Sequence, residues 1–259
     1  MLAIKKLIPH LFTAGNLVGG ILAIIFTLNG HIFFAPFFIF ISAILDFLDG
    51  FVARLLKVQG ELGKQLDSLA DMVTFGVAPG IIVYELAQSK YTVERTSEYT
   101  LYAIERTDTD VYALFPLIGL IIPIFALFRL AKFNLDTRQN DSFIGLPTPA
   151  MTIFVASLPI LPYFAHSSIE KTILENTIFN PYGLSIITIL LSVLMVVELP
   201  LFALKIKNFK WKGNEIRYIF LTISLILLIT LLWWALPLII ILYVVLSLLV
   251  KPKKNEIQS

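Results

Sequence analysis

The sequence contains no cysteine and few charged residues. Charged residues make up 15% of the 259 positions and there are three histidines, whereas 58% of the residues are hydrophobic. The absence of cysteine excludes disulfide bonds and thiolate-ligated metal sites. The scarcity of charge excludes an ordinary soluble globule, because the chain lacks the polar side chains needed to cover such a surface. We therefore expect residues 1–259 to form a single integral-membrane domain.

Long apolar runs divide the chain into segments typical of membrane-spanning helices. An all-α bundle of about eight spans is predicted over residues 11–28, 32–56, 65–87, 111–133, 148–165, 182–204, 217–234 and 236–250. The last two belong to one apolar stretch, which as a single helix would reach about 50 Å and exceed the hydrocarbon thickness of about 30 Å. Trp233 and Trp234, followed by Pro237, predict an interfacial turn there and hence a hairpin.

Basic residues are distributed unequally between the predicted loops. Of the 20 lysines and arginines, all but Lys90, Arg95, Arg106 and Lys171 fall on one side of the bundle. By the positive-inside rule, that side faces the cytoplasm. The distribution therefore predicts cytoplasmic termini and cytoplasmic loops at 57–64, 135–146 and 205–216, with the long polar loop 88–110 outside.

Four aspartates and an arginine interrupt the apolar pattern early in the chain. The residues read Asp46-x₂-Asp49-Gly50-x₂-Ala53-Arg54-x₈-Gly63-x₃-Asp67-x₃-Asp71. The first two aspartates lie one turn apart on one helix face and the last two on another, so two facing helices would bring four carboxylates together. Ionisable groups in a membrane are unfavourable and usually mark a functional site. Four carboxylates suit a hard divalent cation that holds a phosphate, whereas a purely structural ion-pair cluster would need more than one arginine.

The aspartate pattern resembles the signature of the CDP-alcohol phosphatidyltransferases at all eight fixed positions. This resemblance implies that an alcohol displaces CMP from a CDP-linked lipid. It also implies a homodimer and a six-helix catalytic core over residues 8–204, to which a C-terminal hairpin and basic tail over 205–259 are added. Within the motif, Asp46, Asp49, Asp67 and Asp71 correspond to the metal ligands, and Asp71 is the residue to which the family assigns the acceptor's proton. Both Mg²⁺ and Mn²⁺ suit such oxygen ligands.

The residues between the aspartates are suited to a CDP-linked lipid. Arg54 provides a planar fork for phosphate oxygens, while Gly50 and Ala53 leave room for a nucleotide and Gly63 permits close approach from the opposite helix. Asn16 is expected to point inward from the first helix, which in this family approaches the nucleotide. An interhelical hydrogen bond is an equally good interpretation of Asn16, and tight helix packing is the favoured interpretation of the neighbouring glycines.

Three further stretches resemble integral-membrane phosphatidylserine synthases, and this resemblance implies CDP-diacylglycerol and L-serine as substrates. They are residues 67–80, 129–134 and 143–150. A zwitterionic acceptor needs a cation for its carboxylate, and Arg129 and Lys132 lie one turn apart at a helix end. Asn134 and Thr148 offer polar groups nearby. The alternatives are that Arg129 and Lys132 are positive-inside anchors and that Pro147-Thr148-Pro149 is only a helix-start turn.

Other functions fit the same residues less well. Glycerol phosphate, inositol phosphate or inositol could replace serine, but a phosphorylated acceptor would need a denser cationic pocket. An ether-linked lipid could replace the diacyl lipid. An ion-coupled transporter also uses intramembrane carboxylates, but its site would lie near the midplane between repeats, and no repeat is evident. We expect no nucleic-acid partner. Two features stay open: the lone acid Glu198 before Pro200, and the three histidines, which have no partner at metal-ligand spacing and are expected at the interface.

Overall fold

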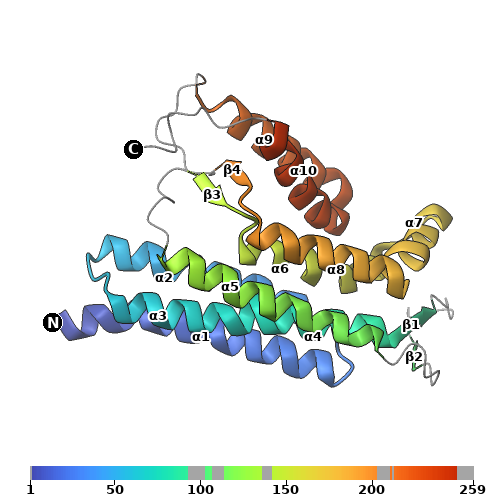
Figure 1. The fold of residues 1–259 in the computed structure, drawn as a ribbon, viewed down its shortest axis with the longest axis horizontal. Coiled ribbons are helices and arrows are strands. Elements are labelled where there is room, and N and C mark those ends of the chain that lie inside the picture. The colour runs from blue at the N-terminus through green and yellow to red at the C-terminus, as the bar shows by residue number, and fades with distance from the viewer. Residues whose placement is uncertain are drawn as a thin grey trace.

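The computed structural model describes residues 2–92, 103–106, 114–135, 142–202, 211 and 213–249. Figure 1 shows a bundle of long helices, with the β1–β2 pair at one end and the β3–β4 pair between the α9–α10 hairpin and the other helices. In chain order the elements are α1 (Leu2–Leu28), α2 (Ala35–Leu55), α3 (Glu61–Asp71), α4 (Ala78–Gln88), β1 (Ser89–Thr92), β2 (Ala103–Arg106), α5 (Ile121–Leu135), β3 (Ser142–Ile144), α6 (Thr148–Ser157), α7 (Ser168–Ile173), α8 (Pro181–Val196), β4 (Pro200–Phe202), α9 (Glu215–Leu231) and α10 (Ala235–Leu249).

Short 3-10 or π-helical segments extend or join several of these helices. They are η1 (Met72–Val77) between α3 and α4, η3 (Phe115–Leu120) before α5, η4 (Leu158–Phe164) after α6, η5 (Leu174–Ile178) after α7 and η6 (Leu232–Trp234) between α9 and α10. The first of these, η1, is a π-helical turn that begins directly after Asp71. Such turns are rare and are frequent at functional sites.

The bundle has the helix lengths and the surface of an integral-membrane protein. Within the described residues, five helical stretches are long and apolar enough to cross a membrane, and a sixth is obtained if the bent pair formed by Ser168–Ile178 and Pro181–Val196 counts as one span. Large apolar side chains are exposed along α1, α2, α5 and α9, as expected of helices that face lipid. The predicted all-α membrane bundle is therefore confirmed, whereas the count of eight spans stays a prediction.

The sixth predicted span ends earlier than expected. It was predicted to continue to residue 204, but α8 ends at Val196, and residues 200–202 form β4, which pairs antiparallel with β3. Pro200 lacks a backbone N–H and disfavours a helical conformation at Leu199, which accounts for the break. Glu198 consequently lies exposed between α8 and β4, outside the helix in which it was predicted.

The C-terminal hairpin forms where the tryptophan pair predicted it. Leu232 has a positive φ of 49° at the turn, and the rings of Phe220 on α9 and Tyr243 on α10 lie 5.8 Å apart, so the two helices are antiparallel neighbours. Trp233 packs against Phe37 of α2 with ring centroids 5.6 Å apart. The hairpin is thus attached to the rest of the bundle. The basic tail 250–259, most of the loop 205–216 and parts of the loops 88–110 and 135–146 lie outside the described residues.

Close packing of α1 determines where the aspartate-bearing helices lie. A Cβ at Gly19 would collide with Ser42 of α2, and a Cβ at Gly20 would lie 2.8 Å from Cα of Thr74. The hydroxyls of Ser42 and Thr74 donate to the backbone carbonyl of Asn16, at 3.1 and 3.0 Å. The packing interpretation of these glycines is confirmed, and α1 holds α2 and η1 in fixed positions beside Asn16.

Candidate functional site

Three carboxylates from two helices meet at one point. Asp46 and Asp49 come from α2 and Asp67 from α3, and one oxygen of each lies within 4.8 Å of the other two. Within the described part of the chain, the buried Oδ1 of Asp67 has no hydrogen-bond partner. Clustered carboxylates with an unsatisfied buried oxygen are unfavourable unless a cation compensates them. Oxygen ligands of this kind fit a hard divalent cation such as Mg²⁺.

Asp71 is a neighbour of this cluster but lies outside the group of three. The Asp46 carboxyl group interacts with those of both Asp67 and Asp71. On its other side, Oδ1 of Asp71 accepts a hydrogen bond of 3.0 Å from Nδ2 of Asn16, which is fully buried. Asp71 therefore has an orientation fixed by α1, and it links the cluster to residues deeper in the bundle.

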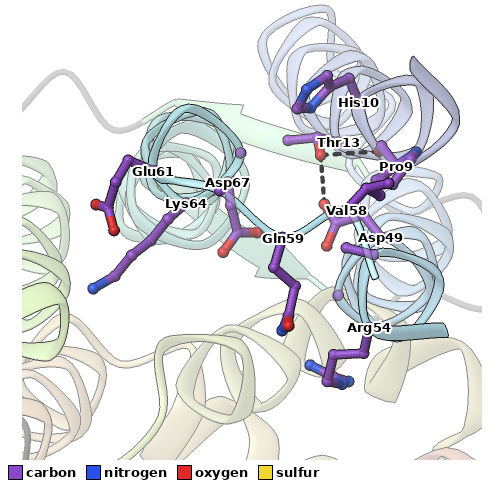
Figure 2. A pocket seen from close by; sticks show the side chains of 14 residues that line it. Pro9, His10, Thr13, Asp49, Arg54, Val58, Gln59, Glu61, Lys64 and Asp67 are labelled. Carbon is purple, nitrogen blue, oxygen red and sulfur yellow. Dashed lines mark hydrogen bonds between the residues drawn. The ribbon is translucent and has the colours of Figure 1, made fainter. Parts of the chain in front are cut away.

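A pocket of about 460 Å³ lies beside the carboxylates, between α1, α2 and α3. Figure 2 shows Asp49 and Asp67 pointing toward one another across it. Its walls are made by Pro9, His10, Thr13, Asp49, Gly50, Ala53, Arg54, Val58, Gln59, Gly60, Glu61, Gly63, Lys64 and Asp67. Four residues predicted to bind the CDP-linked lipid are among them: Gly50, Ala53, Arg54 and Gly63. Asn16, the fifth, does not line the pocket, because its amide is bonded to Asp71.

Two local contacts shape the pocket: one leaves space beside Arg54, and the other orients Asp49. A Cβ at Gly50 would lie 3.2 Å from Nη1 of Arg54, so the glycine leaves room for the guanidinium. On the opposite wall, Oγ1 of Thr13 donates to Oδ2 of Asp49 at 2.6 Å. That hydrogen bond orients the carboxylate without neutralising it.

Several residues that line the pocket were not predicted as part of the site. His10 and Thr13 come from α1, and together with Asn16 they are spaced by three residues, a helical periodicity that could have identified a shared face. Gln59, Glu61 and Lys64 come from the loop and the first turn of α3. The loop 57–64 joins the two halves of the aspartate motif. That position in the sequence could have indicated that its residues lie beside the site.

Arg129 of α5 is a buried cation next to the aspartates. Its side chain is 7% exposed and interacts electrostatically with Asp71. Its Nε donates to the carbonyl oxygen of Leu146 at 2.9 Å, and the guanidinium lies 5.5 Å from the ring centroid of Phe133. A positive-inside anchor would place its charge in the headgroup region. Arg129 is instead buried beside Asp71, and its role toward the acceptor stays a prediction.

The other predicted acceptor residues occupy different environments. Thr148 begins α6 and is 1% exposed, and its hydroxyl has no hydrogen-bond partner among the described residues. Lys132 is exposed. Nδ2 of Asn134 donates to Oγ of Ser68 at 2.7 Å, and the backbone carbonyl of Asn134 accepts from Nζ of Lys64 at 2.6 Å. These contacts hold the end of α5 against α3, and a role of Asn134 or Lys132 toward the acceptor stays a prediction.

Comparisons with known proteins agree with this geometry. A family model described as CDP-alcohol phosphatidyltransferase matches residues 6–250. A CDP-diacylglycerol--serine O-phosphatidyltransferase of Helicobacter pylori (strain ATCC 700392 / 26695) is 33% identical over 227 residues, which are 85% of this chain and 81% of the relative. The protein of the same name in Bacillus subtilis (strain 168) is 38% identical over 55% of this chain and 69% of its own. An archaetidylserine synthase of Methanothermobacter thermautotrophicus is 28% identical over 62% of this chain and 61% of its own.

Proposed function

This chain belongs to the CDP-alcohol phosphatidyltransferase family, and on that premise we propose that it transfers the phosphatidyl group of CDP-diacylglycerol to L-serine, which gives phosphatidylserine and CMP. The observation that carries the reaction is the group of three carboxylates, two of which, Asp49 and Asp67, line a pocket that also contains Arg54. Serine as the acceptor is supported by the names of the relatives and by the buried cation beside Asp71. Membership of a transferase family makes the ion-coupled transporter untenable.

The pocket is suited to the cytidine diphosphate part of the lipid substrate. Gly50, Ala53 and Gly63 contribute little side-chain volume, and Arg54 offers a guanidinium for phosphate oxygens. Asp46, Asp49 and Asp67 would hold a divalent cation, Mg²⁺ or Mn²⁺. The chemistry that such a cation supplies is neutralisation of the pyrophosphate charge and stabilisation of the departing CMP. Asn16 acts indirectly, by orienting Asp71.

Asp71 is the base of the proposed reaction. The acceptor hydroxyl oxygen forms a bond to the phosphorus that carries the diacylglycerol, the bond from that phosphorus to the CMP oxygen breaks, and the hydroxyl proton passes to the Asp71 carboxylate. The hydrogen bond from Asn16 holds one oxygen of Asp71 at 3.0 Å. That bond fixes the orientation of the Asp71 carboxylate, which would take up the proton.

Arg129 would hold the carboxylate of serine. Serine carries its hydroxyl and its carboxylate on adjacent carbons, so a cation beside the base suits this acceptor. Inositol has no carboxylate to match a buried guanidinium, and glycerol phosphate would need more than one cation. Thr148, whose buried hydroxyl has no partner among the described residues, is a second polar group for the acceptor. The lysine and arginine distribution supports a site that opens to the cytoplasm, where CMP is released.

The test uses the purified full chain in lipid nanodiscs with CDP-diacylglycerol and Mg²⁺ or Mn²⁺. L-serine, glycerol 3-phosphate and myo-inositol are supplied one at a time, CMP release is followed, and the lipid product is identified by mass spectrometry. The expected result is phosphatidylserine formation that stops when the metal is chelated. A lipid product from another acceptor, or turnover that continues in excess chelator, would contradict the proposal.

A further inference from the structure

The C-terminal hairpin reaches the segment that holds Arg129. Tyr243 on α10 is 7% exposed, and its hydroxyl donates to the backbone carbonyl of Phe202 at 3.0 Å. Its ring also packs against the rings of Phe202 and Phe220, with centroids 5.0 and 5.8 Å away. One residue of the hairpin is therefore attached to β4 both by a hydrogen bond and by aromatic packing.

From Phe202 the contacts continue to the acceptor side of the site. Phe202 belongs to β4, whose partner β3 runs into Gly145 and Leu146. The backbone N–H of Gly145 donates to Leu199 at 2.9 Å and that of Leu146 to Leu194 at 2.8 Å. The carbonyl of Leu146 then accepts the hydrogen bond from Arg129. Hydrogen bonds joined by the backbone of β3 and β4 thus connect α10 with the segment that binds the guanidinium.

The link has little freedom to adjust. Gly145 has a positive φ of 74°, and a Cβ there would lie 2.5 Å from the carbonyl oxygen of Met195. This backbone conformation favours glycine, and the contact leaves no space for a side chain. The segment that carries Leu146 therefore has little room to shift at Gly145.

We propose that Tyr243 is a positioning residue of the acceptor site, which fixes Arg129 through the β3–β4 pair for the carboxylate of an amino-acid acceptor. This inference rests on the proposed function of Arg129. It assigns the C-terminal hairpin a part in acceptor binding rather than only in membrane anchoring. The nucleotide pocket contains no residue of the hairpin, so the effect of Tyr243 is confined to the acceptor.

The experiment is Tyr243→Phe in the purified full chain, which keeps the ring and removes only the hydroxyl. The KM for L-serine should rise about three- to tenfold, as expected for one buried hydrogen bond, while the KM for CDP-diacylglycerol stays within about twofold. Tyr218→Phe is the matched control, because Tyr218 lies on the same hairpin but its ring stacks on Trp211. Tyr218→Phe should leave both KM values unchanged. Equal changes in both KM values for Tyr243→Phe, together with a lower Tm, would overturn the inference.

A double-mutant comparison separates this inference from the proposed function. If Tyr243 acts through Arg129, then Tyr243→Phe should add nothing to the serine KM of Arg129→Lys, because coupled residues are non-additive. Independent, multiplying effects would overturn the inference. If Arg129→Lys raises the serine KM and Tyr243→Phe does not, the inference fails and the acceptor role of Arg129 stands. If neither variant changes the serine KM, the proposed role of Arg129 fails as well.

Discussion

The aspartate side and the acceptor side of the site are built in different ways. The carboxylates and most of the pocket come from residues 46–71 and one face of α1, so a helix turn and a short loop bring them together. The acceptor side joins Arg129, Leu146, Phe202 and Tyr243, which are far apart in the chain. The first is local and can be recognised from spacing, whereas the second depends on strand pairing and helix packing. Each prediction below tests whether the two sides also act separately.

The largest effect is expected from removal of a cluster carboxylate. Asp67→Asn should lower CMP release on the order of 10²–10³-fold, as for loss of a group that stabilises charge in the transition state, whichever acceptor is supplied. The measurement is CMP release at saturating CDP-diacylglycerol. Glu175→Gln is the matched control, because it removes an exposed acid from η5, outside the pocket. Retained turnover in Asp67→Asn would show that the cluster is not required.

Asp71 lies between the two sides of the site, and its replacement should lower kcat without weakening serine binding. Asp71→Asn keeps the size of the side chain but removes the base, so kcat should fall about 10²-fold, the lower end of the usual range for general base catalysis. The KM for serine should change little, because a transition-state role is lost rather than binding. Steady-state kinetics with serine as the varied substrate measures both quantities. A large rise in serine KM with kcat unchanged would assign Asp71 to acceptor binding instead.

Arg129 should affect the acceptor side alone. Arg129→Ala removes a charge-assisted hydrogen bond from a desolvated position, which corresponds to about 1.5–3 kcal/mol or roughly ten- to 150-fold in serine affinity. Arg129→Lys should restore only part of this, because an ammonium group cannot form a bidentate fork. The readout is the ratio of the serine KM to the CDP-diacylglycerol KM. Equal rises in both KM values would mean that the two sides are not separate.

The smallest effect is expected from Lys132. Its side chain is exposed, and an exposed charge contributes at most about 1 kcal/mol in water. Lys132→Ala should therefore change the serine KM by less than about fivefold. If instead Lys132→Ala matched Arg129→Ala in serine kinetics, the acceptor side would extend to the surface of α5. A protease-protection assay on the same variant would show whether its topology is intact.

Helical spacing accounts for what the sequence predicted correctly. Asp46, Asp49 and Asp67 form one cluster because residues one turn apart share a helix face. The same spacing could not show that Asp71 is held by Asn16, because that contact depends on the close approach of α1 at Gly20. The hairpin was predictable from the length of the apolar stretch. The contact of the hairpin with β4 was not predictable, because α8 ends before Pro200 and residues 200–202 form a strand that hydropathy did not predict.

The acceptor residues show a second limit of the sequence. Arg129 and Lys132 have the same charge and lie one turn apart, yet one is buried beside Asp71 and the other is exposed. Only the packing of α5 against its neighbours distinguishes them. His10 lines the pocket across from Gly63, a position that its spacing in the sequence did not indicate. Spacing identifies candidates, and tertiary contacts decide between them.

The connection from Tyr243 to Arg129 has a consequence for the order in which the protein matures. Chains emerge from the ribosome amino terminus first, so α1 to α4 and all four aspartates are made before α5 exists. Arg129 then enters the membrane before β4 and α10 have been synthesised, and its long side chain must reach toward the interface until they arrive. A nascent chain would therefore possess its nucleotide pocket about 170 residues before its acceptor site is complete. Catalytic competence would be one of the last properties this protein acquires during its synthesis.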